Sequence, residues 1–362
     1  MKHLFRLVAT SLCAALSAAC ASPSPSAFVV RAPQAQAHQG AIGLGSRAES
    51  SQHSKARTFL YAANSSSISV YAPGGTIPIR TITDGIASPS ALAFDYFGNL
   101  YVANSAKGAN TVAVYKPGSS ALLRTIAVGV NRPFDLAFSP AGNLFVSNNL
   151  GLVGRRNVPG SVTVYAPGKS TPLRTITDGI ITPHGIAFDK SGDLYVANCC
   201  HNVQVYAPGG TSPLRTDAYL AFPQRMAFDP YGYLFVANSG GNYYCPGFVA
   251  MYAPQAIKPQ LYIQTGYSCG PFGTLAIDRV GNVYVPSMSS NDVDVFRARS
   301  NSRLYTITGI NSPEDLKFDS NGLLYVANNG SVTVYAFGRK KPLRTITSGI
   351  TGQVLALALG SQ

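Results

Sequence analysis

The sequence predicts an all-β protein, a seven-bladed β-propeller of four-stranded antiparallel blades, and three observations support this. An apolar phrase of the form LYVAN recurs seven times along the 362 residues, at steps of 40 to 50 residues. The text between two such phrases keeps a constant order of strand-like and turn-like segments. The last apolar segment supplies the one strand that the first unit lacks. Repeats of this period are typical of solenoids and propellers, and ring closure selects the propeller.

The recurring phrase predicts the second strand of each blade. Its apolar residues are nearly continuous, as expected for a strand that is buried on both faces. We expect the asparagine that ends most copies to hydrogen-bond the loop that follows. The copies read LYAAN, LYVAN, LFVSN, LYVAN, LFVAN, VYVPS and LYVAN, and they begin at residues 60, 100, 144, 194, 234, 283 and 324.

Three further strands complete each unit. GIAFD (185–189) is a short apolar strand, and the turn DKSGD (189–193) combines an Asp with a Gly that tolerates positive φ. After LYVAN, alternating text ending in VYAPG predicts a third strand, and PLRTIT (172–177) predicts a polar outer strand. No segment combines helical periodicity with helix caps, so every predicted element is a strand.

The two ends of the repeat region predict how the ring closes. The first unit starts near Arg57 with its second strand, and QVLALAL (353–359) is an inner strand with nothing after it. Pairing of this C-terminal strand with the N-terminal blade completes the seventh blade and leaves no exposed sheet edge. We therefore assign residues 57–362 to the propeller.

The N-terminal residues predict export. Residues 1–19 read as a signal peptide, with a basic start and an apolar run too short to span a bilayer comfortably. LSAAC resembles a bacterial lipoprotein box with Cys20 as the lipidated residue, although Ser17 stands where a larger aliphatic residue is usual; ordinary cleavage at Ala19-Cys20-Ala21 is the alternative. Residues 20–56 predict a flexible tether. The expected location is the cell envelope, as a lipoprotein, or the periplasm or exterior, with membrane contact only through the anchor.

The net charge of +13 raises the question of nucleic-acid binding. The recurring arginines are spaced around the ring and form no single patch, and the recurring aromatic residues are expected to pack between blades. We therefore expect no nucleic-acid partner. The arginines are Arg80, Arg124, Arg174, Arg215 and Arg344. The two aromatic series are Tyr61, Tyr101, Phe145, Tyr195, Phe235, Tyr284 and Tyr325, and Tyr71, Tyr115, Tyr165, Tyr206, Tyr252, Phe296 and Tyr335.

LYVAN and the run TPHGIAFDKSGDLYVAN (182–198) resemble the NHL and YVTN classes of bacterial propeller repeats. They are also similar to the repeats of virginiamycin B lyase-like proteins and, more distantly, of gluconolactonase-like ones. The resemblance covers the whole propeller. It implies the fold, and it implies little about activity because such repeats mostly encode blade packing. In the lyase-like and lactonase-like propellers, it implies a metal held by acids, His or Asn at the mouth of the central channel.

The start of each inner strand is expected at this channel mouth. Only His184 and Glu314 are obvious metal ligands there, and they fall on nearly opposite blades. A divalent cation needs several converging oxygens, so we expect no metal and no cofactor, and the pair is a weak catalytic candidate. The positions after the proline are Ser90, Phe134, His184, Gln224, Phe272 and Glu314, and the next positions add Asp135, Arg225 and Asp315.

The repeat is most irregular on one face, over blades 3 to 5. With four strands per blade, the loop after the second strand and the link into the next inner strand share a face, which we call the top. The loops 149–161 and 239–247 are enlarged there, so this face is the expected binding surface. The candidate binding residues are His184, Gln224, Arg225, Arg155, Arg156, His201, Tyr243 and Tyr244.

Four cysteines fall in the same top loops, and export favours disulfides. Cys245–Cys269 is the favoured bridge because both loops leave one blade on one face. Cys199 and Cys200 are adjacent, about 3.8 Å apart at Cα, which is closer than an ordinary bridge allows. Each can instead pair with Cys245 or Cys269. Free thiols, or a metal site with His201, are the other readings.

The leading functional interpretation is a monomeric binding module without catalysis. No G-x-S-x-G, H-E-x-x-H or P-loop motif occurs in the chain. The expected partner is an envelope protein, a glycan or a small molecule, bound on the top face. The alternative is a metal-dependent lyase or lactonase-like enzyme at the channel mouth around His184. A purely structural envelope scaffold is a third interpretation.

Overall fold

The computed structural model describes residues 58–149, 159–198, 202–217, 220, 222–239, 247–265 and 273–361, and the backbone of 152–153 and 156–157. The chain divides into two compact units, Met1–Gln52 and His53–Gln362, and all described residues belong to the second. The predicted signal peptide, the tether and Cys20 therefore lie outside the described residues. Where the structure describes the chain, no helix is long and apolar enough to cross a membrane.

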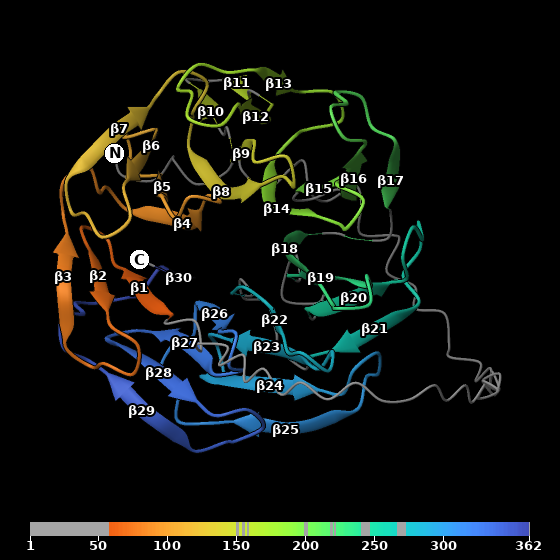
Figure 1. Ribbon diagram of the computed structural model, residues 1–362. Coiled ribbons are helices and arrows are strands. Elements are labelled where there is room, and N and C mark those ends of the chain that lie inside the picture. Colours follow the sequence, from red (N-terminus) through yellow and green to blue (C-terminus); the bar gives the residue numbers. More distant parts are fainter. Residues whose placement is uncertain are drawn as a thin grey trace, which may run out of the picture. The chain divides into compact units, whose positions relative to one another are not determined.

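The described part of the second unit is a ring of seven four-stranded antiparallel sheets, as predicted (Figure 1). We number the blades in chain order and give the strands from the channel outward. Blade 1 contains β30 (Ala356–Gly360), β1 (Phe59–Ala63), β2 (Ile68–Tyr71) and β3 (Pro78–Ile82); blade 2 contains β4 (Pro89–Phe94), β5 (Leu100–Asn104), β6 (Thr111–Tyr115) and β7 (Leu122–Ile126). Blade 3 contains β8 (Pro133–Phe138), β9 (Leu144–Asn148), β12 (Ser161–Tyr165) and β13 (Arg174–Ile176); blade 4 contains β14 (Pro183–Phe188), β15 (Leu194–Asn198), β16 (Asn202–Tyr206) and β17 (Arg215–Asp217).

The remaining blades have the same strand order. Blade 5 contains β18 (Pro223–Phe228), β19 (Leu234–Asn238), β20 (Phe248–Tyr252) and β21 (Leu261–Gln264); blade 6 contains β22 (Ala276–Ile277), β23 (Val283–Ser287), β24 (Asp292–Phe296) and β25 (Arg303–Ile307). Blade 7 contains β26 (Asp315–Phe318), β27 (Leu324–Asn328), β28 (Ser331–Tyr335) and β29 (Pro342–Ile346). A separate two-stranded hairpin, β10 (Leu152–Val153) with β11 (Arg156–Asn157), lies in the long top loop of blade 3.

The ring closes through the C-terminal strand. β30 pairs antiparallel with β1, with Leu60 opposite Leu359 and Ala62 opposite Leu357. The strand that the first unit lacks therefore comes from the other end of the repeat region, which confirms the predicted closure. Because β30 occupies the inner edge of β1, blade 1 is completed by residues almost 300 positions away in the sequence.

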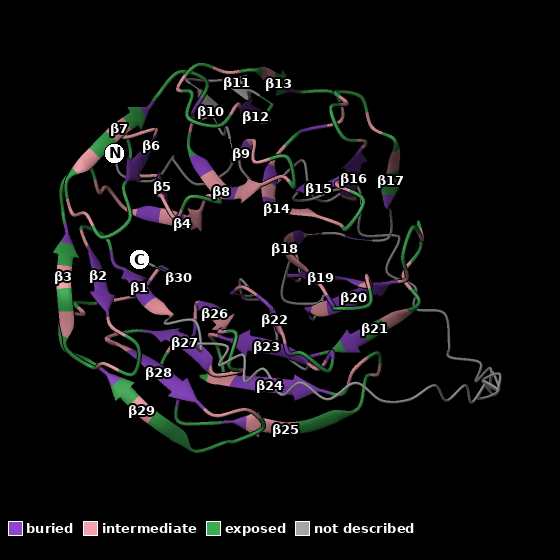
Figure 2. Cartoon of the chain, viewed as in Figure 1, coloured by how far each residue is buried: buried purple, intermediate pink, exposed green. Residues whose placement is uncertain are grey.

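Burial falls from the middle of each blade outward. All five residues of β5 are buried, whereas the outer strand β7 alternates between half-buried and exposed residues before one buried isoleucine, Ile126. The same contrast recurs around the ring, with buried second and third strands and largely exposed outer strands (Figure 2). This pattern is the reason that LYVAN is almost uniformly apolar while PLRTIT is not.

The turn between the first and second strands is built by its first residue. In blade 2, Asp95 Oδ1 accepts the N–H groups of Phe97 and Asn99, both at 2.9 Å. Gly98 completes the turn at φ +79°, a conformation that other residues rarely adopt. An aspartate has this role in blades 2, 4, 5, 6 and 7, whereas blade 3 has Ser139, whose hydroxyl accepts the Asn143 N–H at 3.2 Å. These turns lie on the face opposite the top, which we call the bottom.

The recurring aromatic residues pack between blades, as expected. Tyr101 of blade 2 meets Phe138 of blade 3 edge-on, with ring centroids 5.0 Å apart, and Tyr195 of blade 4 meets Phe228 of blade 5 in the same way. The second series ends the third strand of each blade. Tyr165 is fully buried, and its hydroxyl donates to the Val128 carbonyl at 2.7 Å. The aromatic residues therefore serve the scaffold.

The asparagine that ends the second strand acts differently from our expectation in most blades. Asn64 does cap the loop that follows, accepting from Ser67 N–H at 2.8 Å. In blades 2 to 5, however, the side-chain oxygen accepts an N–H from the link that precedes the inner strand; Asn104 accepts from Ala87 at 2.9 Å, for example. The inner strand pairs with the second strand, so its incoming link passes beside this asparagine. For blades 2 to 5, the prediction was therefore wrong: the side-chain oxygen accepts its hydrogen bond from the link before the inner strand and not from the loop after the second strand.

Candidate functional site

A β-bulge at the start of the inner strands positions the candidate residues at the channel mouth. In blade 4, Pro183 pairs with Asn198, and the next regular pair is Ile186 with Val196. His184 and Gly185 thus stand together opposite one residue of β15. Blade 5 has the same bulge after Pro223, at Gln224 and Arg225. Bulges commonly redirect side chains next to functional sites.

His184 lies in an aromatic stack that joins three blades. Its ring is parallel to that of Phe134 from blade 3, with centroids 4.3 Å apart and an interplanar angle of 11°. The guanidinium carbon of Arg225 from blade 5 lies 4.5 Å from the centre of the same Phe134 ring. Such contacts contribute about 0.5–1.5 kcal/mol each, and here they fix the plane of the imidazole.

A chain of hydrogen bonds favours one tautomer of His184. The Ser239 hydroxyl donates to the Phe222 carbonyl at 3.5 Å and accepts from Gln224 Nε2 at 3.2 Å. This orientation leaves Gln224 Oε1 to accept a hydrogen bond from the Nδ1–H of His184, at 2.5 Å. With the proton on Nδ1, Nε2 of a neutral imidazole carries a lone pair. His184 therefore presents a hydrogen-bond acceptor.

The electrostatics of the mouth keep His184 neutral. Burial lowers the pKa of His184, the hydrogen bond to Gln224 raises it, and the nearby positive charge of Arg225 lowers it, with a net downward shift. Burial raises the pKa of Glu314, Arg225 lowers it and Asp315 raises it, with a net upward shift. Arg225 thus acts on both groups. Among the described contacts, none joins His184 to Glu314 directly.

Arg225 is held by an ion pair that crosses from blade 5 to blade 3. Its Nη1 lies 3.1 Å from Asp135 Oδ1, and both side chains are only about a fifth exposed, at 20% and 17%. The other carboxylate oxygen of Asp135 accepts the Ile186 N–H of blade 4 at 3.1 Å. Asp135 therefore links three consecutive blades at the mouth, and this places the guanidinium over Phe134.

The structure brings together three of the predicted binding residues, His184, Gln224 and Arg225. Glu314 lies near enough to Arg225 for the positive charge to lower its pKa. Arg156 belongs to β11, of which only the backbone is described. The other candidates lie outside the described residues. They are Arg155, His201, Tyr243 and Tyr244, together with all of the predicted disulfide cysteines, Cys199, Cys200, Cys245 and Cys269.

Sequence reasoning missed two partners in this group, Phe134 and Ser239. Phe134 holds the position in blade 3 that His184 holds in blade 4, so an alignment of the blades could have suggested that neighbouring copies of this position touch. The Asp135–Arg225 pair also carries a signal, because opposite charges occupy the same position in two blades. Ser239 follows an ordinary LFVAN copy and gives no such signal.

Over the described residues, no three or more His, Cys, Asp or Glu side chains gather closely enough to hold a metal ion. The groups that contact one another around His184 are an imidazole, an amide, a guanidinium, an aromatic ring and the carboxylate of Asp135, which is paired with Arg225. This arrangement can donate and accept hydrogen bonds and can stack against a flat or apolar ligand surface.

Comparison with known proteins agrees with the repeat. Residues 182–206 match the family model of the NHL repeat; they span the three inner strands of blade 4 and include His184. No curated protein sequence gives a significant match to the chain. The likeness to virginiamycin B lyase-like proteins stays a prediction. The matched blade and the repetition of its fold around a closed ring together support a β-propeller of the NHL type.

Proposed function

We propose that this propeller is a non-catalytic binding module that takes its ligand on the top face, at the channel mouth of blades 3 to 5. NHL-type propellers suit such a role because rigid blades carry irregular surfaces. The observation that supports the proposal is the hydrogen bond between His184 Nδ1 and Gln224 Oε1, which leaves Nε2 as the acceptor of the ring. Its Nε2 accepts a hydrogen bond next to the guanidinium of Arg225, which donates.

The site combines a hydrogen-bond acceptor, His184 Nε2, with a donor, Arg225, next to the stacked rings of His184 and Phe134. This combination favours a ligand rich in hydroxyl groups. A hydroxyl both donates and accepts, so two neighbouring hydroxyls can bind His184 Nε2 and Arg225 together. The apolar faces of sugar rings also pack well against stacked side chains. We therefore favour a glycan or a small polyol over the other ligands expected from the sequence.

The test is a screen of glycans followed by titration calorimetry of the best binder. His184→Phe preserves the stack on Phe134 and removes both ring nitrogens, so we expect at least tenfold weaker binding. Tyr96→Ser, at a bottom-face side chain that is 95% exposed, is the matched control and should bind like the wild type. Equal affinity of His184→Phe and the wild type contradicts the proposal, as does a wild type that binds no glycan.

We also propose that the protein is exported and anchored by a lipid on Cys20, on the strength of the leader sequence. The prediction is that the wild type fractionates with membranes, that Cys20→Ala is released in soluble form, and that intact mass shows acyl chains only on the wild type. Soluble wild-type protein with the mass of the bare polypeptide contradicts the anchor.

The alternative, a metal-dependent lyase or lactonase-like enzyme, is favoured by one observation. An unprotonated Nε2 is the form of histidine that ligates metals or accepts a proton. This alternative predicts uptake of a divalent cation by the wild type that His184→Ala abolishes, together with turnover of lactones. Calorimetry with Mg²⁺, Mn²⁺ and Zn²⁺ that shows no uptake contradicts it and leaves the binding proposal untouched.

A further inference from the structure

The outer-strand arginines follow one rule in four blades. Each stacks over the aromatic ring of the second strand and donates from Nη2 to its tyrosine hydroxyl, which fixes the guanidinium. The pairs are Arg80–Tyr61 at 2.9 Å, Arg124–Tyr101 at 2.7 Å, Arg215–Tyr195 at 2.5 Å and Arg344–Tyr325 at 3.5 Å. The ring contacts are 5.2 to 6.0 Å from the guanidinium carbon to the ring centre.

In blades 2, 4 and 7, the aspartate of the bottom turn completes this arrangement. In blade 4, the Tyr195 hydroxyl also lies 3.4 Å from Asp189 Oδ2. In blade 7, burial and then Asp319 raise the pKa of Tyr325, while Arg344 lowers it. The carboxylate, the hydroxyl and the guanidinium therefore form a balanced set in which the arginine has both a hydrogen-bond acceptor and a counter-charge.

Blade 3 keeps the arginine and loses both of its partners. Arg174 stands opposite Val164 just as Arg124 stands opposite Val114, so its position on the sheet is the same. The ring beneath it is Phe145, at 5.6 Å, which has no hydroxyl, and the turn begins with Ser139 instead of an aspartate. In blades 5 and 6, by contrast, the arginine itself is replaced, by Leu261 and Tyr305.

Within the described part of the chain, Arg174 makes no hydrogen bond or ion pair. Its Nε is buried without a partner, a feature that it shares with Arg80, Arg124 and Arg344. Arg174 differs from them in the terminal nitrogens of its guanidinium, which contact neither a tyrosine hydroxyl nor a carboxylate among the described residues. A half-buried cation above a hydrocarbon ring is therefore left without an anionic partner from its own blade.

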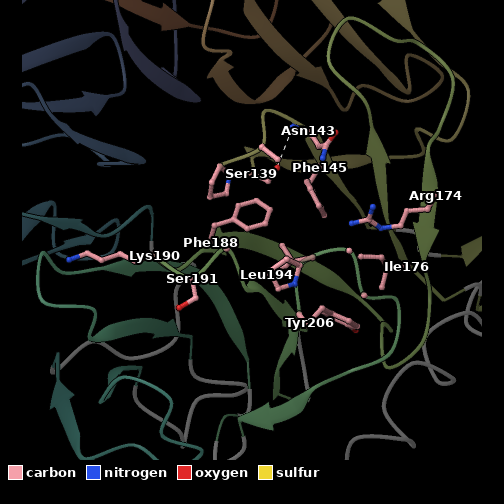
Figure 3. A pocket seen from close by; sticks show the side chains of 17 residues that line it. Ser139, Asn143, Phe145, Arg174, Ile176, Phe188, Lys190, Ser191, Leu194 and Tyr206 are labelled. Atoms are coloured by element: carbon pink, nitrogen blue, oxygen red, sulfur yellow. Dashed lines mark hydrogen bonds between the residues drawn. The ribbon is translucent and has the colours of Figure 1, made fainter.

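This guanidinium borders a hollow of about 210 Å³ between the bottom turns of blades 3 and 4 (Figure 3). Arg174 reaches toward Phe145 at its wall, and Ser139 and Ser191 add hydroxyls. Among the residues that the structure describes, no Asp or Glu lines the hollow. Lys190 extends away from it and donates to the Pro230 carbonyl at 2.6 Å. The nearby carboxylates of blade 4 face Tyr195 and Arg215 instead.

We propose that this hollow binds a small oxyanion, a phosphate, sulfate or carboxylate group, through Arg174. The guanidinium fork matches two oxygens of such a group, and the serine hydroxyls can donate to the others. The bound anion supplies the negative charge and the acceptor that the aspartate and the tyrosine supply in the sister blades. The site lies on the bottom face, away from the channel mouth, and is independent of the proposed top-face function.

The experiment measures the thermal unfolding midpoint of the whole protein in sodium phosphate, sodium sulfate and sodium acetate, against sodium chloride at equal ionic strength. Binding to the folded state raises the midpoint as the anion concentration rises. We expect a saturable rise for the wild type with at least one anion in the millimolar range, and at least tenfold weaker binding for Arg174→Gln. Arg124→Gln, in the intact set of blade 2, should keep the wild-type response.

A second variant keeps the test independent of folding defects. Ser139→Asp with Phe145→Tyr rebuilds the sister-blade set around Arg174, so it should lose the anion response while remaining as stable as the wild type. His184→Phe should keep the response. A response to phosphate and sulfate without acetate identifies a tetrahedral anion, and the reverse identifies a carboxylate. Equal responses of Arg174→Gln and the wild type, or no wild-type response beyond chloride, overturn the proposal.

Discussion

The ion pair between Asp135 and Arg225 gives the sharpest quantitative prediction about the channel mouth. Asp135→Asn removes the charge opposite Arg225 while an amide oxygen remains to accept the Ile186 N–H, now 3.1 Å from the carboxylate. Breaking a fully buried pair costs about 3–5 kcal/mol, and breaking an exposed pair about 0–1 kcal/mol. With both side chains about a fifth exposed, at 17% and 20%, we expect a loss of about 2 kcal/mol.

Asp135→Ala should cost more, because it also leaves the Ile186 N–H without an acceptor. An unsatisfied buried donor costs about 1–3 kcal/mol, so the expected total is about 3–5 kcal/mol. Asp315→Asn is the matched control. It keeps the acceptor for the Leu357 N–H at 2.8 Å, and its ion pair is with Lys317, 3.5 Å away, whose side chain is 38% exposed. Its loss of charge should therefore cost less than about 1 kcal/mol.

The assay is urea unfolding of Asp135→Asn, Arg225→Gln and the double variant, analysed by linear extrapolation. A direct pair predicts a coupling energy of about 1 kcal/mol or more between the two substitutions. Single-variant losses that add to the double-variant loss within about 0.5 kcal/mol would refute the ion pair. So would a loss for Asp135→Asn no larger than that for Asp315→Asn, since both replace an aspartate that accepts a backbone N–H from the next blade.

Three further predictions concern titration and ring closure. The pKa of His184 is lowered from 6.5 in the folded protein, so the unfolded chain binds this proton more readily. The free energy of unfolding of the wild type should therefore fall as the pH drops below about 6.5, and it should fall less steeply in His184→Gln. Urea titrations at several pH values measure both slopes. The pKa of Glu314 is raised from 4.5, so the folded state favours the protonated carboxyl, and ionisation of this buried group at higher pH lowers the stability of the fold. Glu314→Gln should therefore be more stable than the wild type near pH 7, with the difference vanishing below about pH 4.5; a less stable variant at pH 7 contradicts this. Leu357→Ala, at a closing-strand residue that is 1% exposed, should cost about 2–5 kcal/mol in chemical denaturation, and an unchanged midpoint would contradict closure through β30.

The scaffold was predictable because each blade repeats the same pattern of buried and exposed strands. A second strand covered on both sides must be apolar throughout, so LYVAN identifies β5 and β27 without any knowledge of the ring. The unpaired ends of the repeat predicted the pairing of β30 with β1. The role of Asn104 was not predictable in the same way, because it depends on which of two top loops passes closer to the end of the strand.

The arrangement at the channel mouth required the structure. The sequence placed His184 and Gln224 at equivalent positions 40 residues apart, but their hydrogen bond depends on how two bulged strands face each other. The ion pair of Asp135 with Arg225 skips a blade, and no local pattern encodes that distance. Arg174 shows the same limit: its missing partners are visible in the sequence only once the Arg–Tyr–Asp contacts of the sister blades are known.

The most direct test of the proposed binding site is the ¹⁵N spectrum of the His184 imidazole during titration with the glycan that the screen selects. The spectrum is recorded on histidine-labelled protein near pH 7, with His184→Gln for assignment. We expect a protonated Nδ1 and an unprotonated Nε2, and the Nε2 resonance should move toward the hydrogen-bonded range as ligand is added. An imidazole protonated on Nε2, or an Nε2 resonance that does not change at saturating ligand, would contradict it.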